Sequence, residues 1–409
     1  MREHELRRQV VSEMHLRRWP QLHVPGKVIQ WVLMTDREDR EAELAHLDPI
    51  LPAPADKPNA PHRSGDFSPG IAVAWERHSE GSSLALFAKG TDPDLADALE
   101  WARGLPGQIV RATNMTLVKD DRAAKRLLPK MNFDPHEIVS CYIGGKARIW
   151  ADFRLQGDGF GHILVAANGL DDRDFSRTVQ RLQDLGNYRN KALLGLPEAQ
   201  EHWPRLDAIE TELAKLADRL CANNGRDDDL MAELSSLSLE LTTVATMTGY
   251  RMSATRAYAQ LVQERLEELQ VKPIDGFASL NTFTKRRFLP AARFCEALVV
   301  REEQLSQRAE RLASLLRARI DTRIENQNAE LMRSMDRSSK LQLRLQQLVE
   351  GLSVVALSYY LLGLVTWGLE GWDGVDATDT VALLVVPTVL TMFIGVRIAK
   401  RRLLGSGED

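Results

Sequence analysis

The chain contains little cysteine and no closely spaced cysteine pair. Its 409 residues include three cysteines, Cys141, Cys221 and Cys295. This spacing excludes a disulfide scaffold and a cysteine zinc cluster, and it is typical of a reducing compartment. Lys and Arg number 53 and Asp and Glu number 57, which gives a net charge of −4. Such a balance excludes a protein whose whole surface is a nucleic-acid footprint, so we expect no nucleic-acid partner.

Common catalytic motifs are also missing. The sequence has no H-E-x-x-H, G-x-S-x-G, P-loop or G-x-G-x-x-G, so it predicts no catalytic or cofactor-binding residues. One strand-like run, residues 75–80, alternates so that Glu76, His78 and Glu80 share a face. Two carboxylates and an imidazole could hold a divalent cation. The alternative for this face is a solvated, ion-paired or interface surface.

Charged residues are absent from two runs near the C-terminus, residues 351–369 and 380–396. Each run is long enough to cross about 30 Å of hydrocarbon as a helix. The sequence therefore predicts two transmembrane helices. The alternative is a pair of helices buried in a large soluble core.

The flanks of these runs predict their orientation. The charged residues between the runs are all acidic, namely Glu370, Asp373, Asp376 and Asp379. Basic residues lie outside them, including Arg337, Lys340, Arg344, Arg401 and Arg402. The positive-inside rule then puts both termini in the cytoplasm, and the acidic connection outside would attract cations. The basic residues are candidates for contact with lipid headgroups, with a solvated face as the alternative. Residues 1–8 are highly charged, so we expect no signal peptide.

A long helix is predicted to enter the first run. No glycine or proline occurs from residue 291 to residue 350. Leucines 341, 345, 348 and 352 recur at coiled-coil spacing. The seam becomes polar upstream, around Asn326, Gln327 and Asn328. It either packs within the chain or joins copies around an axis in a homo-oligomer. In the second case the residues facing a pore would be Asn326, Gln327, Asn328, Ser353, Tyr359 and Tyr360.

The remaining sequence predicts two cytosolic parts. Residues 1–195 alternate strand-like and helical runs, typical of an α+β domain with helices on one face of a sheet. The expected strands are 27–34, 71–77, 83–87, 109–118, 138–143, 147–154 and 161–167. Residues 49–69 contain six prolines and are predicted to form a loop outside the sheet. Residues 196–350 predict a helical domain that begins with a hairpin turning at residues 223–225 and ends in the long stalk. Residues 351–402 form the predicted two-span hairpin.

Several strings together carry a family resemblance. They are residues 75–80, Asp152-Phe153-Arg154 followed by Asp158-Gly159-Phe160, Tyr188-Arg189, residues 250–258, and residues 341–347 running into 350–353 and 358–360. Their order resembles the domain-of-unknown-function family numbered 3422, bacterial membrane proteins without assigned activity. That resemblance implies that the protein is located in the bacterial inner membrane.

The layout is also similar to that of CorA-type magnesium channels, which are homopentamers with the first span lining a pore. Their Gly-Met-Asn signature is absent here, where Gly371-Trp372-Asp373 occupies that region.

Three functions are compatible with these patterns. The first is a membrane-anchored, homo-oligomeric scaffold or sensor whose N-terminal part binds a cytosolic partner through Trp75, His78, Asp152 and Arg154. The second is a CorA-like cation channel or transporter. The third is a membrane-anchored enzyme.

Overall fold

A computed structural model describes residues 3–7, 11, 19–53, 60–369 and 377–404. Contacts divide the chain into two compact units, Met1–Ala313 and Ser314–Asp409. The acidic residues Glu370, Asp373 and Asp376 lie outside the described residues. The predicted boundaries at residues 195 and 350 stay a prediction.

The first unit contains a nine-stranded sheet in the order β2-β3-β4-β1-β5-β8-β7-β6-β9. The strands are β1 (Gly26–Met34), β2 (His62–Ser68), β3 (Ile71–His78), β4 (Gly81–Lys89), β5 (Gln108–Val118), β6 (Val139–Ile143), β7 (Ala147–Ala151), β8 (Gly161–Ala166) and β9 (Lys272–Pro273). Neighbours are antiparallel except β5 and β8, which run parallel. The mixed α+β architecture predicted for the N-terminal part is confirmed.

Part of the proline-rich segment joins the sheet. Strand β2 pairs with β3, from His62 opposite Glu76 to Ser68 opposite Ile71. The prediction of a loop is therefore wrong for residues 62–68. Pro61 and Pro69 flank this strand, and the strand itself lies at the edge of the sheet, where flanking prolines interrupt no ladder.

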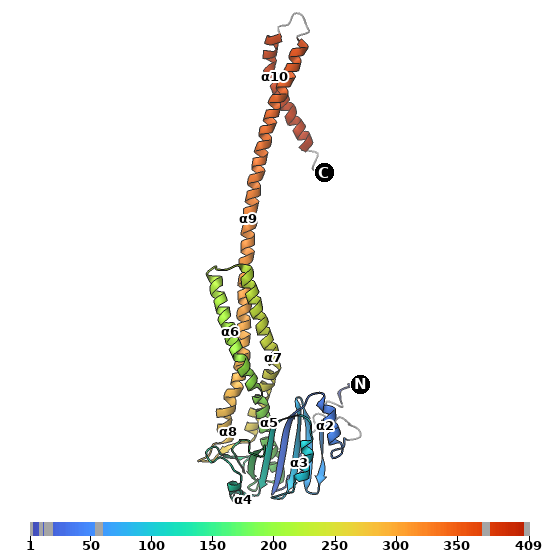
Figure 1. Ribbon diagram of the computed structural model, residues 1–409, viewed down its shortest axis with the longest axis vertical. Helices are drawn as coiled ribbons and strands as arrows, with labels where there is room; N and C mark the ends of the chain where they lie inside the picture. Colours follow the sequence, from blue (N-terminus) through green and yellow to red (C-terminus); the bar gives the residue numbers. More distant parts are fainter. Residues whose placement is uncertain (1–2, 8–10, 12–18, 54–59, 370–376, 405–409) are drawn as a thin grey trace. The chain divides into compact units, whose positions relative to one another are not determined.

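Helices cover both faces of the sheet (Figure 1), and the prediction of a single covered face is wrong. On one face, α5 (Asp172–Leu193) and α7 (Asp227–Glu268) pack side chains such as Phe175 and Val262 against the strands. On the other face, α2 (Asp39–Leu47) and α3 (Ala96–Arg103) cover Trp31 and Trp75, and α4 (Asp121–Leu127) covers Trp150. The physical reason is visible in β4, where every residue but the last is buried.

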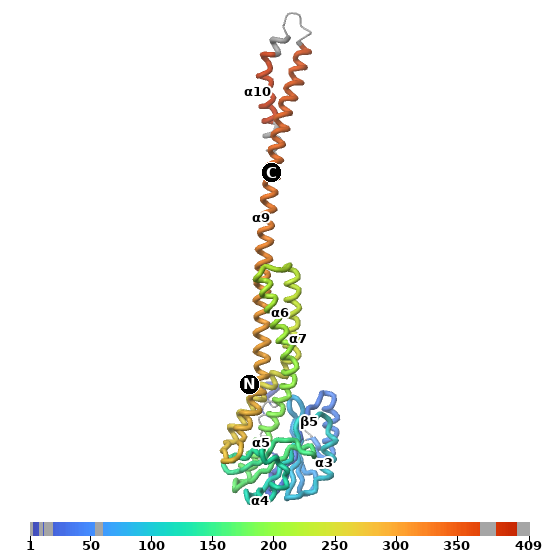
Figure 2. The backbone as a smooth tube through the Cα atoms, turned by 60° about the vertical axis from the view of Figure 1, so that its left-hand side comes forward, coloured from blue at the N-terminus to red at the C-terminus, as the bar shows by residue number. Residues whose placement is uncertain are grey.

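Three helices run side by side away from the sheet within the first unit (Figure 2). They are α6 (Gly195–Cys221), α7 and the first part of α9 (Leu289–Leu369). The predicted hairpin is confirmed, because α6 and α7 are joined at residues 222–226. Arg301 of α9 pairs with Asp207 and Glu210 of α6 at 2.6 and 2.5 Å. The short elements η1 (Leu128–Lys130), α8 (Leu280–Phe283) and a π-helical turn (Thr284–Phe288) complete the unit.

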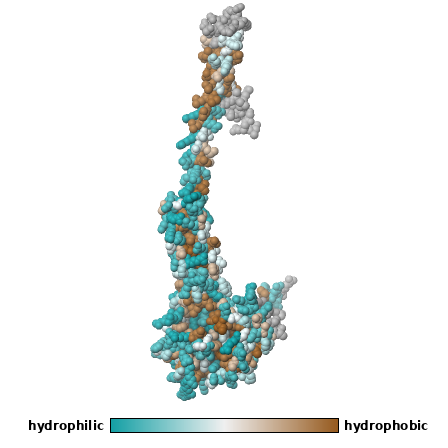
Figure 3. Space-filling view, viewed as in Figure 1, coloured by the Kyte–Doolittle hydropathy of each residue, from teal (hydrophilic) through white to brown (hydrophobic). Residues whose placement is uncertain are grey.

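The second unit contains the rest of α9 and α10 (Ala377–Leu404). The predicted long helix is confirmed, since α9 is continuous over 81 residues. Among the described residues, one helix, Leu280–Gly368, is long and apolar enough to cross a membrane, and its apolar window is 11% buried. The second apolar run gives a shorter apolar helix, Ala382–Ile398. Within this unit, hydrophobic side chains gather over the last part of α9 (Figure 3).

Candidate functional site

A cavity of about 300 Å³ opens in the first unit beside the amino end of β8, where the parallel pair β5 and β8 begins. Strand β5 contributes Arg111 and Thr113, and helix α5 contributes Arg189. The connection between β7 and β8 contributes Phe153 and Arg154. Three arginines therefore line one small cavity.

Arg111 is held by neutral oxygen atoms. Its Nη1 donates to Oδ1 of Asn187 at 2.6 Å, to Oε1 of Gln183 at 2.8 Å and, at the longer distance of 3.4 Å, to Oε1 of Gln30. All three amides are at least nine-tenths buried, and Arg111 itself is 7% exposed. Amide oxygens orient a guanidinium group without cancelling its charge, so the positive charge is available to a ligand.

Gly186 makes this position of Arg111 possible. A Cβ atom on Gly186 would lie 2.5 Å from Nη2 and 2.6 Å from Cζ of Arg111. The guanidinium group therefore lies directly against the backbone of α5. The backbone of Gly186 is helical, so glycine is not needed here for an unusual backbone conformation. It is needed because any side chain would prevent the close approach of Arg111.

Arg189 lacks a polar partner among the described residues. It is 9% exposed, and its guanidinium carbon lies 4.5 Å from the ring centre of Phe153 and 5.2 Å from that of Phe283. Neither a hydrogen bond nor an ion pair joins it to any part of the chain that the structure describes. Stacking on aromatic rings offsets only part of the cost of burying a guanidinium group.

Burial lowers the pKa of both arginines. The pKa of Arg189 falls to about 10 because of burial alone. The pKa of Arg111 falls to about 9, mainly through burial and further through repulsion by Arg189. Both groups are still charged at neutral pH, and Asp184 offsets only part of the positive charge, through its attraction to Arg111. An anion in the cavity would remove this penalty.

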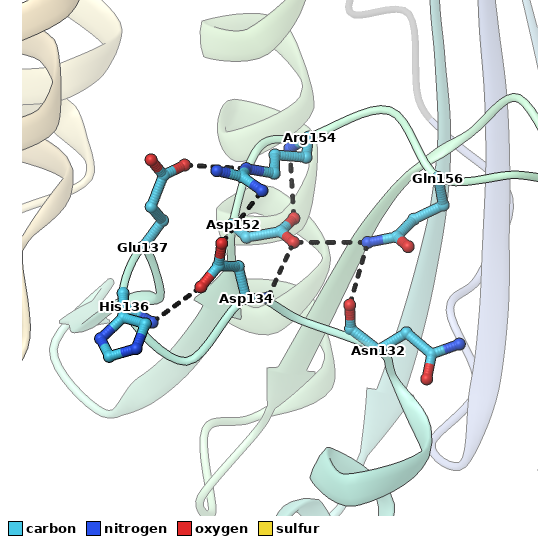
Figure 4. Close-up of polar contacts among 7 residues, drawn as sticks. All are labelled: Asn132, Asp134, His136, Glu137, Asp152, Arg154 and Gln156. Atoms are coloured by element: carbon cyan, nitrogen blue, oxygen red, sulfur yellow. Dashed lines mark hydrogen bonds and ion pairs between the residues drawn. The ribbon is translucent and has the colours of Figure 1, made fainter.

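A polar network fixes the loop that carries Phe153 and Arg154 (Figure 4). The buried carboxylate of Asp152 accepts from the backbone N–H of Arg154 at 3.1 Å and of Asp134 at 3.3 Å, and from Nε2 of Gln156 at 3.3 Å. Arg154 also pairs with Asp134 at 3.0 Å and with Glu137 at 2.9 Å. Two carboxylates thus neutralise Arg154, whereas Arg111 and Arg189 keep their charge for the cavity.

The predicted cation ligands lie in a different place. Nε2 of His78 lies 3.0 Å from Oγ of Ser83. Glu80 lies in the turn after β3, where it pairs with Arg251 of α7 at 3.0 Å and accepts from the hydroxyl of Tyr258 at 2.7 Å. In the described part of the chain, no group of three or more His, Cys, Asp or Glu side chains is arranged to hold a metal ion. A metal site at Glu76, His78 and Glu80 stays a prediction without a supporting contact.

The predicted partner surface is wrong for two of its four members. Trp75 is fully buried, with its Nε1 donating to Glu43 at 3.0 Å, and Asp152 is 4% exposed. Arg154 is exposed but lies within the network of Figure 4. Trp75 and Asp152 are therefore not available to a partner, and a contact through His78 and Arg154 stays a prediction.

The residues predicted to face a pore or lipid all lie on α9 or beyond it. Asn326, Gln327, Asn328, Ser353, Tyr359 and Tyr360 are exposed in the single chain. So are Arg337, Lys340 and Arg344, and Lys340 pairs with Asp336 at 2.6 Å. The backbone of Asp379, Arg401 and Arg402 lies within helix α10.

Sequence reasoning missed Arg111, Gly186 and Arg189 as site residues, although Tyr188-Arg189 is one of the family strings. A signal was present, because Arg189 falls on the apolar face of α5 at helical spacing from Leu182 and Leu185. A buried-face arginine without an acidic neighbour at helical spacing indicates a ligand or a distant partner.

The chain belongs to the family described as Protein of unknown function (DUF3422), whose model matches residues 2–403. The resemblance to this family drawn from the sequence strings is confirmed. No curated protein and no solved structure matches the chain. The similarity of layout to CorA-type channels therefore has no support from a match.

Proposed function

We propose that the protein is a membrane-anchored sensor of the bacterial inner membrane, in which the N-terminal α+β unit responds to a small anion. The sequence alone leaves scaffold and sensor open. The observation that favours a sensor is Arg189, nine-tenths buried on the wall of a cavity and without a polar partner among the described residues. An unpaired buried charge destabilises the fold, and a scaffold that binds no ligand would gain nothing in return for this loss of stability.

Membrane anchoring is supported by the end of α9. Its apolar side chains are exposed in the single chain, for example Leu352 at 71% and Leu364 at 69%. Side chains of this kind are stable in water only when another surface covers them. The proposed arrangement has two spans, the second being residues 380–396, with both termini in the cytoplasm.

Self-association is supported by the segment of α9 before the apolar run. Leu341, Leu345 and Leu348 share one face of the helix and are 61%, 61% and 73% exposed. Their spacing suits packing against copies of the same helix. We propose a homo-oligomer joined along this seam.

Two experiments test the proposal. Alkaline carbonate washing of membranes should leave the full chain in the pellet, whereas release into the supernatant would contradict anchoring. For the sensor role, the purified full chain in detergent should gain thermal stability from at least one small anion, because a ligand that binds only the folded state stabilises it. The Arg189→Met variant should gain none. Identical responses in both proteins would contradict the role of the cavity.

A CorA-like cation channel is the second candidate. The observation that favours it is the exposed polar segment of α9 at Asn326, Gln327 and Asn328, which in an oligomer could surround a wet path. Cation flux into liposomes containing the full chain would support conduction, and replacing Asp373 and Asp376 by Asn should then alter that flux. A membrane-anchored enzyme is the third candidate, and no catalytic set of residues supports it in the described part of the chain.

A further inference from the structure

We propose that the ligand of the cavity is a small organic monocarboxylate, with its carboxylate group paired to Arg189 and its apolar part against Ile109, Phe153 and Leu155. This inference rests on the proposed sensor function and names the class of ligand. It follows from three features of the cavity: the guanidinium donors, the backbone groups that are already engaged, and the apolar rim.

The guanidinium donors favour an oxyanion that can accept two parallel hydrogen bonds. The group of Arg189 has a planar fork of N–H donors, and none of them is engaged by a described residue. A carboxylate accepts two parallel hydrogen bonds from such a fork. Phe153 and Phe283 lie 4.5 and 5.2 Å from the guanidinium carbon and restrict its movement, which lowers the entropy lost on binding.

The backbone around the cavity offers little to a phosphate group. Phosphate sites commonly use free N–H groups of a glycine-rich loop or a helix N-terminus. Here the N–H of Gly159 donates to the carbonyl of Gln156 at 3.0 Å, and the N–H of Phe160 donates to Asp158 at 3.1 Å. Arg189 lies near the C-terminal end of α5, where the helix dipole disfavours a group with two negative charges. A singly charged carboxylate suits this environment better.

Part of the cavity lining is apolar and exposed. Ile109 is 62% exposed and Leu155 is 75% exposed, and both line the cavity together with the buried Ile163. A ligand with a hydrocarbon or aromatic part would cover these side chains, and removing their apolar surface from water favours binding. The volume of about 300 Å³ is at the small end of the range for ligand cavities. These features favour a small ligand that is partly apolar.

The experiment measures binding by calorimetry to the purified full chain in detergent, with benzoate, benzamide and inorganic phosphate as probes. Benzoate should bind at least about tenfold more tightly than either other probe, a difference of about 1.4 kcal/mol. Benzamide has the same shape without the charge, and phosphate has the charge without the apolar part.

Variants of the protein then test whether benzoate binds at Arg189. Arg189→Met should weaken benzoate binding at least about tenfold, and Arg189→Lys, which keeps the charge but loses the fork, should also weaken it. Arg181→Met is the matched control, because Arg181 lies on the same helix and pairs with Glu268 at 3.1 Å outside the cavity. It should leave benzoate binding unchanged. Cooperative melting of each variant verifies folding, and Arg189→Lys tests the site independently if Arg189→Met does not fold.

The outcomes separate this inference from the proposed function. Tighter binding of phosphate than of benzoate would overturn the inference that the ligand is a carboxylate, but it would still support the proposed function of an anion sensor. Equal binding of benzoate and benzamide, or benzoate binding that persists in both Arg189 variants, would also overturn it. If no anion of any class binds or stabilises the full chain, both the inference and the proposed sensor fail.

Discussion

The guanidinium group of Arg111 lies against the backbone of α5 at Gly186, so closely that a Cβ atom there would be 2.5 Å from Nη2. Strand β5 and helix α5 are thereby joined by a charged group in addition to the apolar side chains that they share in the core. Arg111 lines the same cavity as Arg189.

Replacing Gly186 by Ala should displace Arg111 and weaken anion binding. Arg111 is buried and held by three amide oxygens, so its shift costs on the order of 1 kcal/mol for each hydrogen bond that breaks. Together these losses outweigh the gain of about 0.5–1 kcal/mol that alanine brings to a helical position. Gly249→Ala is the matched control, because Gly249 is also helical and a Cβ there meets nothing within 4 Å. The control should gain about 0.5–1 kcal/mol. Denaturant unfolding and calorimetry measure both effects, and parallel behaviour of the two variants would refute the close contact.

Asp184 should make the stability of the first unit depend on pH. Burial raises the pKa of Asp184 to about 7, with Glu76 and Glu268 adding to the rise and Arg265 and Arg111 opposing it. The ordinary value in an unfolded chain is about 3.9. The stabilising contribution of the protonated group is therefore complete below about pH 4 and is lost as the pH rises through about 7.

Asp184→Asn removes that titration. The variant should be more stable than the natural protein at about pH 8, and the difference should shrink toward about pH 4. Melting temperatures measured across this range provide the test. A difference that is constant with pH would show that the fold does not raise the pKa of Asp184 above its unfolded value.

Asp152→Asn should loosen the loop of Figure 4. The carboxylate accepts three hydrogen bonds, and the amide nitrogen of Asn would face donors in place of one acceptor oxygen. We expect a loss of about 1–3 kcal/mol in stability. Benzoate affinity should fall as well, because Phe153 and Arg154 follow directly in the chain. Unaltered affinity with reduced stability would separate the loop from the binding site.

A cysteine at position 348 should cross-link neighbouring copies of the chain. Leu348 is 73% exposed and lies on the proposed seam, whereas Leu343, 59% exposed, lies off it and provides the control. The exposed Cys221 is first replaced by Ser, while Cys141 and Cys295 are buried. Mild oxidation of membranes should give disulfide dimers from Leu348→Cys and few from Leu343→Cys. Equal yields would argue against a specific seam.

The sequence predicted local structure well where one pattern dominates. The strands at residues 27–34 and 71–77, the hairpin at 223–225 and the uninterrupted helix of α9 follow from apolar alternation, turn residues and the absence of Gly and Pro. Strand β2 was missed because prolines surround it on both sides, and composition alone does not separate a proline-flanked edge strand from a loop. The second helix layer was missed because near-continuous apolar strands do not reveal which helices will cover them.

What the sequence determined by itself is the distribution of apolar residues along the chain: an α+β part, a long helix and an apolar end. The tertiary structure decided which charges meet. Arg111, Gln183, Gly186 and Arg189 come from a strand and a helix that are about seventy residues apart in the chain. Burial makes the chemistry of these side chains different from that of the exposed arginines. Burial is a property of the packed sheet and helix, and no local pattern in the sequence specifies it.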